Sequence, residues 1–150
     1  MIFPRKPARI FAGALTAAAI ASLCQVSTSY ATGTIGKDDL SGPWAITLFG
    51  DTGCGTTSML ATGPLDTTGN STTFTLKMHS SGCGNSTTTE DFKIITLNPN
   101  GSGTAGLTCN NKQNCGWTFA IQVAPDRSVF NLVDISDGGN NRLQGTAVHQ

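Results

Sequence analysis

The segment Thr73-Phe74-Thr75-Leu76-Lys77-Met78-His79 carries the clearest strand pattern of the chain. Its large apolar side chains alternate strictly with Thr, Lys and His, so one face of the segment is apolar and the other is polar. An alternation with a period of two is typical of a β-strand that is buried on one face. The stretch therefore predicts a strand and supplies the pattern by which the other strands are found.

Seven further segments show a related pattern, rich in β-branched and aromatic residues, and turn residues separate each from the next. Asn98-Pro99-Asn100-Gly101 is the clearest turn, because Asn and Gly tolerate positive φ and Pro fixes its own φ. No segment after the first 31 residues favours a helix. The eight predicted strands are about Trp44–Phe49, Thr57–Leu65, Thr73–His79, Thr88–Leu97, Thr104–Cys109, Gly116–Ala124, Ser128–Ile135 and Leu143–His149.

Short strands with tight connections favour an all-β, eight-stranded antiparallel up-and-down barrel over a Greek key. Eight strands form the smallest such meander that closes around a usable interior. An immunoglobulin-type sandwich is the structural alternative, but it usually places a cysteine pair between its sheets, whereas these cysteines stand at turns. Because Glu90 shares a face with Phe92 and Ile94, the start of the fourth segment is expected to lie outside the core.

Residues 1–31 have the features of a secretory signal peptide. Three basic residues precede the apolar run Ile10–Leu23, and Ser29-Tyr30-Ala31 offers small residues where a signal peptidase cleaves. A transmembrane anchor is the alternative, but it needs ~20 apolar residues and this run is shorter. We expect residues 32–150 to form a single β-barrel domain, secreted or periplasmic, with no membrane span after cleavage.

The charge of the predicted domain excludes some partners. The whole chain has nine Lys or Arg and nine Asp or Glu, and three of the basic residues lie in the predicted signal peptide. The remaining six basic and nine acidic residues give a net charge of −3. Without a basic patch, neither a nucleic acid nor an anionic membrane surface is expected as a partner.

Four cysteines follow the signal peptide, and an even number in a small exported domain predicts two disulfides. In an up-and-down meander every second loop lies at the same end, which places Cys54, Cys83, Cys109 and Cys115 at one rim. We therefore predict the pairs Cys54–Cys83 and Cys109–Cys115, each contributing ~2–4 kcal/mol. A zinc site would need closer spacing, such as C-x-x-C. Neither a metal nor a cofactor is expected.

Leu40-Ser41-Gly42-Pro43-Trp44, at the start of the first predicted strand, resembles the L-x-G-x-W motif of calycin barrels. That group includes lipocalins, avidins and small bacterial metalloprotease inhibitors. The resemblance covers residues 32–150 as architecture, but only these five residues as sequence. It implies that Trp44 closes the barrel floor and that a basic residue near the last strand packs over it, for which Arg142 is the candidate.

A lipocalin-like site would be an apolar cup entered between the rim loops. Its candidate interior residues are Met59, Phe74, Leu76, Met78, Phe92, Trp117, Phe119 and Ile121, and its candidate rim residues are Asp51, Asn85, Asn111, Lys112 and Asn140. The alternative is that the interior side chains simply fill the barrel, as in the smallest barrels. An avidin-like site is lined by several Trp and a Tyr. Biotin is not expected, because the predicted domain has two Trp and no Tyr.

The expected function is non-enzymatic binding of a small apolar or amphipathic ligand, in or at the mouth of the barrel. The alternative is a protease inhibitor or a cell-envelope or surface interaction module with a filled core, using residues 32–39 as a flexible arm. Catalysis is not expected, because His79 and His149 stand alone and no catalytic motif occurs. The partner is thus a small molecule or a protein, and the oligomeric state stays open.

Overall fold

The computed structural model describes residues 33–109, 116–136 and 142–150. The predicted signal peptide lies outside this part of the chain. No helix among these residues is long and apolar enough to cross a membrane. The elements are a short 3-10 helix, η1 (Asp38–Leu40), and the strands β1 (Gly42–Thr52), β2 (Gly55–Leu65), β3 (Asn70–Ser80), β4 (Gly84–Leu97), β5 (Ser102–Cys109), β6 (Gly116–Val123), β7 (Val129–Asp134) and β8 (Arg142–His149).

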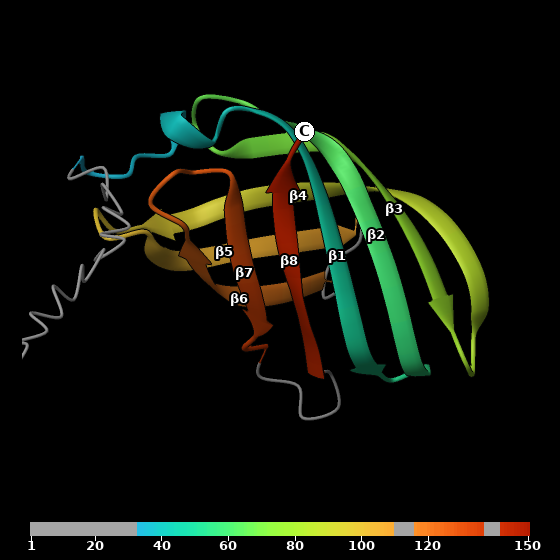
Figure 1. The fold of residues 1–150 in the computed structure, drawn as a ribbon. Helices are drawn as coiled ribbons and strands as arrows, with labels where there is room; N and C mark the ends of the chain where they lie inside the picture. The colour runs from blue at the N-terminus through green and yellow to red at the C-terminus, as the bar shows by residue number, and fades with distance from the viewer. Residues whose placement is uncertain (1–32, 110–115, 137–141) are drawn as a thin grey trace, which may run out of the picture.

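The eight strands are hydrogen-bonded in sequence order and form one closed barrel (Figure 1). Each strand is antiparallel to its neighbours, and β8 closes the barrel by pairing with β1 from Trp44↔His149 to Asp51↔Arg142. The structure confirms the all-β, eight-stranded antiparallel up-and-down barrel predicted from the sequence. Each predicted segment falls on one of the observed strands. The period-two pattern marks the strands and the turn residues mark their ends, so the two signals predict the same boundaries to within a few residues.

Glycine permits the close approach of β1 and β8 that closes the barrel. Gly145 on β8 lies opposite Leu48 on β1. A Cβ atom at Gly145 would collide with the carbonyl oxygen of Thr47. The closing strand pair therefore depends on the missing side chain at this position.

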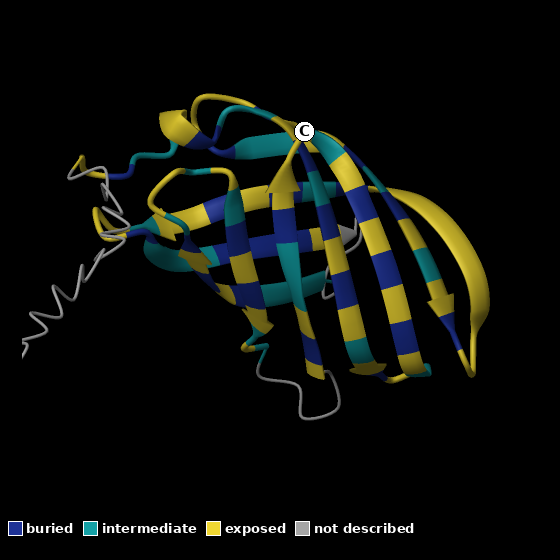
Figure 2. Ribbon diagram, in the orientation of Figure 1, coloured by how far each residue is buried: buried dark blue, intermediate teal, exposed yellow. Residues whose placement is uncertain are grey.

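β4 is longer than the sequence predicts and begins at Gly84 rather than near Thr88. Residues 84–89 pair with β3, and within the described residues β4 joins β5 only from Glu90↔Cys109 onward. These six residues are exposed and form the long exposed band at the right of Figure 2. They are small and polar, so no apolar alternation marks them as a strand, and the hairpin with β3 extends them instead.

The barrel interior is filled by large apolar side chains. Buried and exposed residues alternate along the strands, as the bands in Figure 2 show. The ring centroids lie 4.8 Å apart for Trp44 and Phe130, 5.2 Å apart for Phe74 and Phe92, and 6.3 Å apart for Phe92 and Phe130. With Phe119, these residues are among the largest fully buried side chains. Such an aromatic cluster contributes both buried area and favourable ring contacts.

One end of the barrel, which we call the floor, is covered by residues 33–41. The backbone N–H of Ile35 donates to the carbonyl of Pro99 at 3.0 Å, and Arg127 Nε lies 3.3 Å from Asp39 Oδ2. Lys37 Nζ donates to the carbonyl of Ile94 at 2.6 Å. The inhibitor alternative requires a flexible arm here, but from residue 33 onward the segment is packed on the barrel. The backbone, ionic and side-chain contacts hold it there.

Trp44 lies at the floor and is 1% exposed. Its Nε1 donates to the carbonyl of Leu40 at 2.7 Å, which ties η1 to the start of β1. Arg142 does not pack over it, because the antiparallel register places Arg142 opposite Asp51, at the far end of β1. His149 stands there instead, with its ring centroid 5.0 Å from that of Trp44 and the two planes at 70°. The role predicted for Arg142 is wrong, since the last residues of β8, not its first, reach the floor.

The opposite end, which we call the mouth, carries the turns between β1 and β2 and between β3 and β4. A disulfide joins Cys54 to Cys83 across these two turns, with Cα atoms 5.4 Å apart. The structure thus confirms this predicted pair. Cys109 ends β5, but its side chain and all of Cys115 lie outside the described residues, so the second predicted disulfide stays a prediction.

Candidate functional site at the barrel mouth

The candidate interior residues divide into two groups by burial. Six of them are 0–5% exposed and belong to the packed core: Met59, Phe74, Leu76, Phe92, Phe119 and Ile121. Met78 and Trp117 are instead half-buried and pack against the edge of that core. The protein's own side chains therefore occupy the deep interior. Among these eight residues, the inner-face apolar surface that solvent can reach belongs to Met78 and Trp117, at the mouth.

Glu90 is the first buried residue of β4, at the point where this strand enters the barrel. It is 4% exposed, whereas the six preceding residues of the strand are exposed. Glu90 pairs with Phe74 on β3 and with Cys109 on β5, and it shares the inner face with Phe92. The carboxyl group thus lies among apolar side chains, and its Oε2 atom has no hydrogen-bond partner within the described residues.

Two more buried polar atoms face the interior near this end of the barrel. Trp117 is the second residue of β6, and its indole Nε1 is buried without a hydrogen-bond partner in the described part of the chain. Asp134 ends β7 and follows the inward-facing Phe130 and Leu132 in the period of two. Its Oδ1 accepts the backbone N–H of Ser136 at 2.8 Å, but its Oδ2 is likewise buried and unpartnered there.

The Oδ1 atom of Asp91, next to Glu90 on β4, is also buried without a partner within the described residues, whereas Thr52, Thr57 and Ser80 are satisfied by the protein itself. The hydroxyl groups of Thr52 and Thr57 are 2.9 Å apart and hydrogen-bonded. Ser80 Oγ accepts the backbone N–H of Cys83 at 3.0 Å. Buried polar groups in proteins nearly always have such partners. The unpartnered oxygens of Glu90 and Asp134 and the indole N–H of Trp117 are therefore exceptions that call for an explanation.

The candidate rim residues lie at the mouth but do not converge. Asp51 is exposed and pairs across strands with Thr56 and Arg142. Asn85 is exposed, and its side chain is hydrogen-bonded to His79 Nδ1. Asn111, Lys112 and Asn140 lie outside the described residues.

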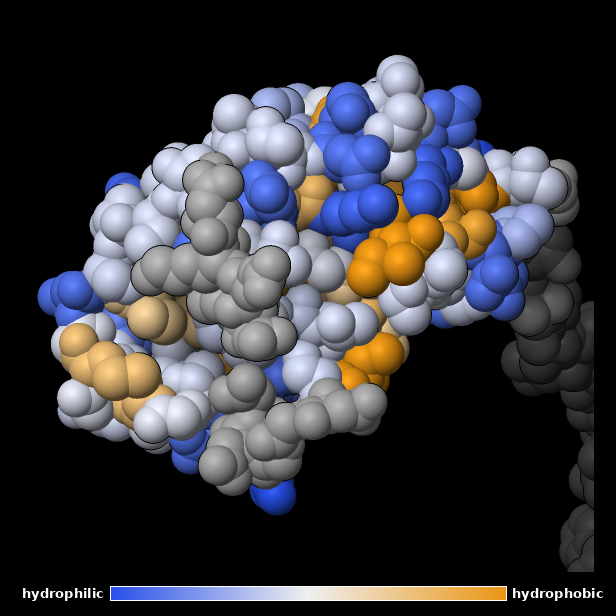
Figure 3. Space-filling model, turned by 180° about the vertical axis from the view of Figure 1, so that it is seen from behind, coloured by the Kyte–Doolittle hydropathy of each residue, from blue (hydrophilic) through white to orange (hydrophobic). Residues whose placement is uncertain are grey.

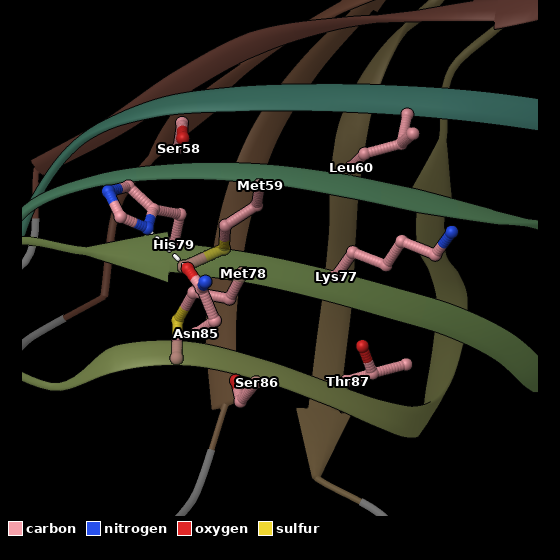
Figure 4. A pocket seen from close by; sticks show the side chains of 9 residues that line it. All are labelled: Ser58, Met59, Leu60, Lys77, Met78, His79, Asn85, Ser86 and Thr87. Carbon is pink, nitrogen blue, oxygen red and sulfur yellow. Dashed lines mark hydrogen bonds between the residues drawn. The ribbon is translucent and has the colours of Figure 1, made fainter.

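A shallow groove of about 380 Å³ crosses β2, β3 and β4 close to the mouth (Figure 4). Its residues alternate along each strand between the inner and the outer face. Met59, Met78 and Ser86 belong to the inner set, and the outer set consists of Ser58, Leu60, Lys77, His79, Asn85 and Thr87. Figure 4 shows His79 and Asn85 facing one another across the β3–β4 hairpin. Met78 therefore lines the groove and also packs against the core on the inner face.

Two further grooves lie on the outside of the barrel. One, of about 310 Å³, follows the turn between β2 and β3, and another, of about 440 Å³, lies over β7 and β8 beside Phe49. In the view of Figure 3 the apolar atoms form separate patches among polar ones. The described residues contain no cluster of three or more His, Cys, Asp or Glu that would hold a metal ion.

Three exposed carboxyl groups at the floor have a lowered pKa. The backbone N–H of Gly36 lowers the pKa of Asp39 most, and Arg127 adds to this effect. The backbone N–H of Asn70 does the same for Asp66, and that of Ser128 for Asp126. Each carboxylate thus stabilises a turn or segment that covers the floor.

Glu90 and Asp134 are not among the candidate site residues predicted from the sequence. The face that Glu90 shares with Phe92 indicates an inward position, but its charge favours a position outside the core. Residues 84–89 are indeed exposed, whereas Glu90 itself is buried. For Asp134 the same period of two, counted from Phe130, places the side chain inward.

No family model, no curated protein and no solved structure matched this chain. The closed eight-stranded antiparallel barrel is consistent with a calycin-like fold. No sequence or structural match supports a particular type within that group.

Proposed function

We propose that this chain is a non-enzymatic exported binding protein that holds a small amphipathic ligand at the mouth of its barrel. The observation that carries the proposal is the contrast between a filled interior and half-buried apolar side chains, Met78 and Trp117, at its edge. Ligand sites combine apolar lining with a few polar groups that fix orientation. Glu90, Asp134 and the indole of Trp117 supply polar groups of this kind.

The filled interior limits how the ligand is held. The aromatic cluster around Phe92 occupies the space that a deeply buried ligand would need. A ligand at the mouth would cover Met78 and Trp117, and each 100 Å² of apolar surface removed from water contributes about 2.5 kcal/mol. This favours an amphipathic ligand that lies across the mouth, with its apolar part against these two side chains, over a wholly apolar ligand held deep in the interior.

Export is part of the proposal. A disulfide joins Cys54 and Cys83, and disulfides persist in oxidising compartments such as the periplasm or the extracellular space. The segment with signal-peptide features supports the same location.

Titration calorimetry with 1-dodecanol tests the proposed site. Met78→Ala is expected to weaken binding about fivefold, because roughly 1 kcal/mol of apolar contact is lost. Leu60→Ala is the matched control, since Leu60 lies on the outer face of the neighbouring strand and is 40% exposed. Equal losses in both variants would place the ligand in the outer groove and contradict binding at the mouth. No binding to the unmodified protein would overturn the proposal itself.

The filled interior also favours one alternative, a protease inhibitor or a surface interaction module that binds another protein. With residues 33–39 packed on the floor, such a protein would use its outer surface rather than a free arm. Native mass spectrometry of the protein purified from the compartment to which it is exported separates the two. A co-purified small molecule supports the ligand-binding proposal, and a co-purified protein supports the alternative.

A further inference from the structure

We infer that the mouth selects ligands whose polar head is a cationic amine, and that Glu90 is the residue that binds it, with Asp134 in support. The inference rests on the proposed function, because it names the chemical class of the ligand for the same site. It is carried by two inward-facing carboxyl groups, each with a buried oxygen that lacks a hydrogen-bond partner within the described residues.

The position of Glu90 suits contact with a ligand at the mouth. Glu90 marks the boundary between the exposed first part of β4 and the buried remainder of the strand. Its neighbours across the strands are Phe74 and Cys109, so its carboxyl group lies at the upper edge of the apolar core. Trp117 lies on the other side of β5, opposite Leu107. β5 lies between the two residues, and both occupy inner-face positions, so Glu90 and Trp117 both border the interior space at the mouth.

The charges around this space favour a cation. On the described strands no Lys or Arg faces the interior, because Lys77, Lys93 and Arg142 are exposed residues at outward positions. Lys37 and Arg127 lie at the floor, where they contact Ile94 and Asp39. Glu90 and Asp134 are thus the charged side chains that point inward there. Hydrogen bonds from an ammonium group to a carboxylate are stronger than those between neutral groups. They would also satisfy oxygens that are otherwise costly to bury.

The apolar part of the ligand has a place beside this head group. Met78 and Trp117 are half-buried. Met59 pairs with Met78 across the strands, and Leu76 precedes Met78 on the inner face of β3, with 4% and 3% exposure. Methionine adapts to ligands of different shape, and an aromatic face attracts cations. A primary amine with a linear alkyl chain therefore matches both parts of the site.

Three twelve-carbon probes of the same length separate charge from apolar binding: dodecylamine, 1-dodecanol and dodecanoate. With the unmodified protein at pH 7.4, calorimetry is expected to show dodecylamine binding at least tenfold more tightly than 1-dodecanol, and dodecanoate binding more weakly than either. Glu90→Gln keeps the size of the side chain and removes its charge. This variant should bring dodecylamine to within about twofold of 1-dodecanol, while Glu90→Asp should keep the preference for the amine.

The outcomes distinguish the inference from the proposed function. If dodecylamine and 1-dodecanol bind equally well, or if Glu90→Gln leaves the preference unchanged, the mouth binds ligands but the inference is wrong. If none of the probes binds, both the inference and the proposed function fail. Should Glu90→Gln not fold, Asp134→Asn provides a second variant. Its preference for the amine is expected to fall at least threefold, and an unchanged preference would exclude the supporting role of Asp134.

Discussion

At the scale of single residues, Trp44 shows how one side chain joins several parts of the floor. Its indole N–H is bonded to Leu40, and its ring contacts Phe130 and His149. Trp44→Phe would leave the buried carbonyl of Leu40 without its donor and would create a small void. We expect this change to lower the free energy of unfolding by about 2 kcal/mol. Chemical denaturation followed by circular dichroism measures the loss, and an unchanged midpoint would show that the indole contacts contribute little.

Gly145 offers a second test at this scale. Because a Cβ atom there would collide with the backbone of Thr47, Gly145→Ala should destabilise the closing strand pair by about 1–3 kcal/mol. Gly53 serves as the control, because a Cβ atom added there would meet nothing within 4 Å. Thermal unfolding should show a clearly lowered midpoint for Gly145→Ala and almost no change for Gly53→Ala. Equal midpoints for the two variants would contradict the role assigned to Gly145.

At the scale of elements, the disulfide is what ties the two hairpins together at the mouth. Cys54 and Cys83 are 29 residues apart in the sequence. Closing a loop of that length restricts the unfolded chain and is expected to contribute about 3–4 kcal/mol. The double variant Cys54→Ser, Cys83→Ser should lose that amount in urea denaturation. A loss below about 1 kcal/mol would mean that hydrogen bonds between the turns hold the mouth without the disulfide.

The floor is expected to be the acid-sensitive end of the barrel. The folded protein lowers the pKa of Asp39 below its ordinary value of about 3.9. Its contribution to stability is therefore complete above pH ~4 and is lost as the pH falls through the lowered pKa. Asp39→Asn should reduce stability at pH 7 and flatten its decline between pH ~4 and pH ~2. A variant with the same decline as the unmodified protein would show that Asp39 is not responsible.

The elements also show what the sequence can and cannot predict. Phe74, Leu76 and Met78 alternate with polar residues, so a strand follows from local pattern alone. Residues 84–89 have no such alternation, and their strand depends on pairing with β3. The contacts of Ile35 and Asp39 with Pro99 and Arg127 join segments that are far apart in the sequence. They depend on the closed barrel, and no local signal predicts them.

The candidate site was predictable only in part for a similar reason. The inward face of each strand follows from the period of two, and Met78 and Trp117 were identified in this way. The closure of the barrel decides which inward residues are packed and which stay accessible. Phe119 and Trp117 both face inward on β6, but Phe119 is buried and Trp117 is half-buried. A buried carboxyl group contradicts the usual preference of Glu for the surface, so Glu90 became visible as a site residue only in the structure.

At the scale of the whole molecule, the two ends of the barrel differ in structure. The floor is covered by residues 33–41 and is stabilised by Trp44 and by carboxylates with a lowered pKa. The mouth is held by the disulfide and carries half-buried apolar side chains beside unpartnered polar atoms. We therefore propose that the mouth is the end that binds the ligand, while the floor is the end that is closed and covered.

Nuclear magnetic resonance can test whether the ligand binds at the mouth, because the chain carries its own reporters at both ends. Trp44 and Trp117 are its two tryptophans, and Met59 and Met78 are two of its three methionines. On addition of dodecylamine, the indole N–H signal of Trp117 and the methyl signal of Met78 should shift in a saturable manner. The indole signal of Trp44 should stay in place. Shifts confined to Trp44, or no shift at saturating probe, would contradict binding at the mouth.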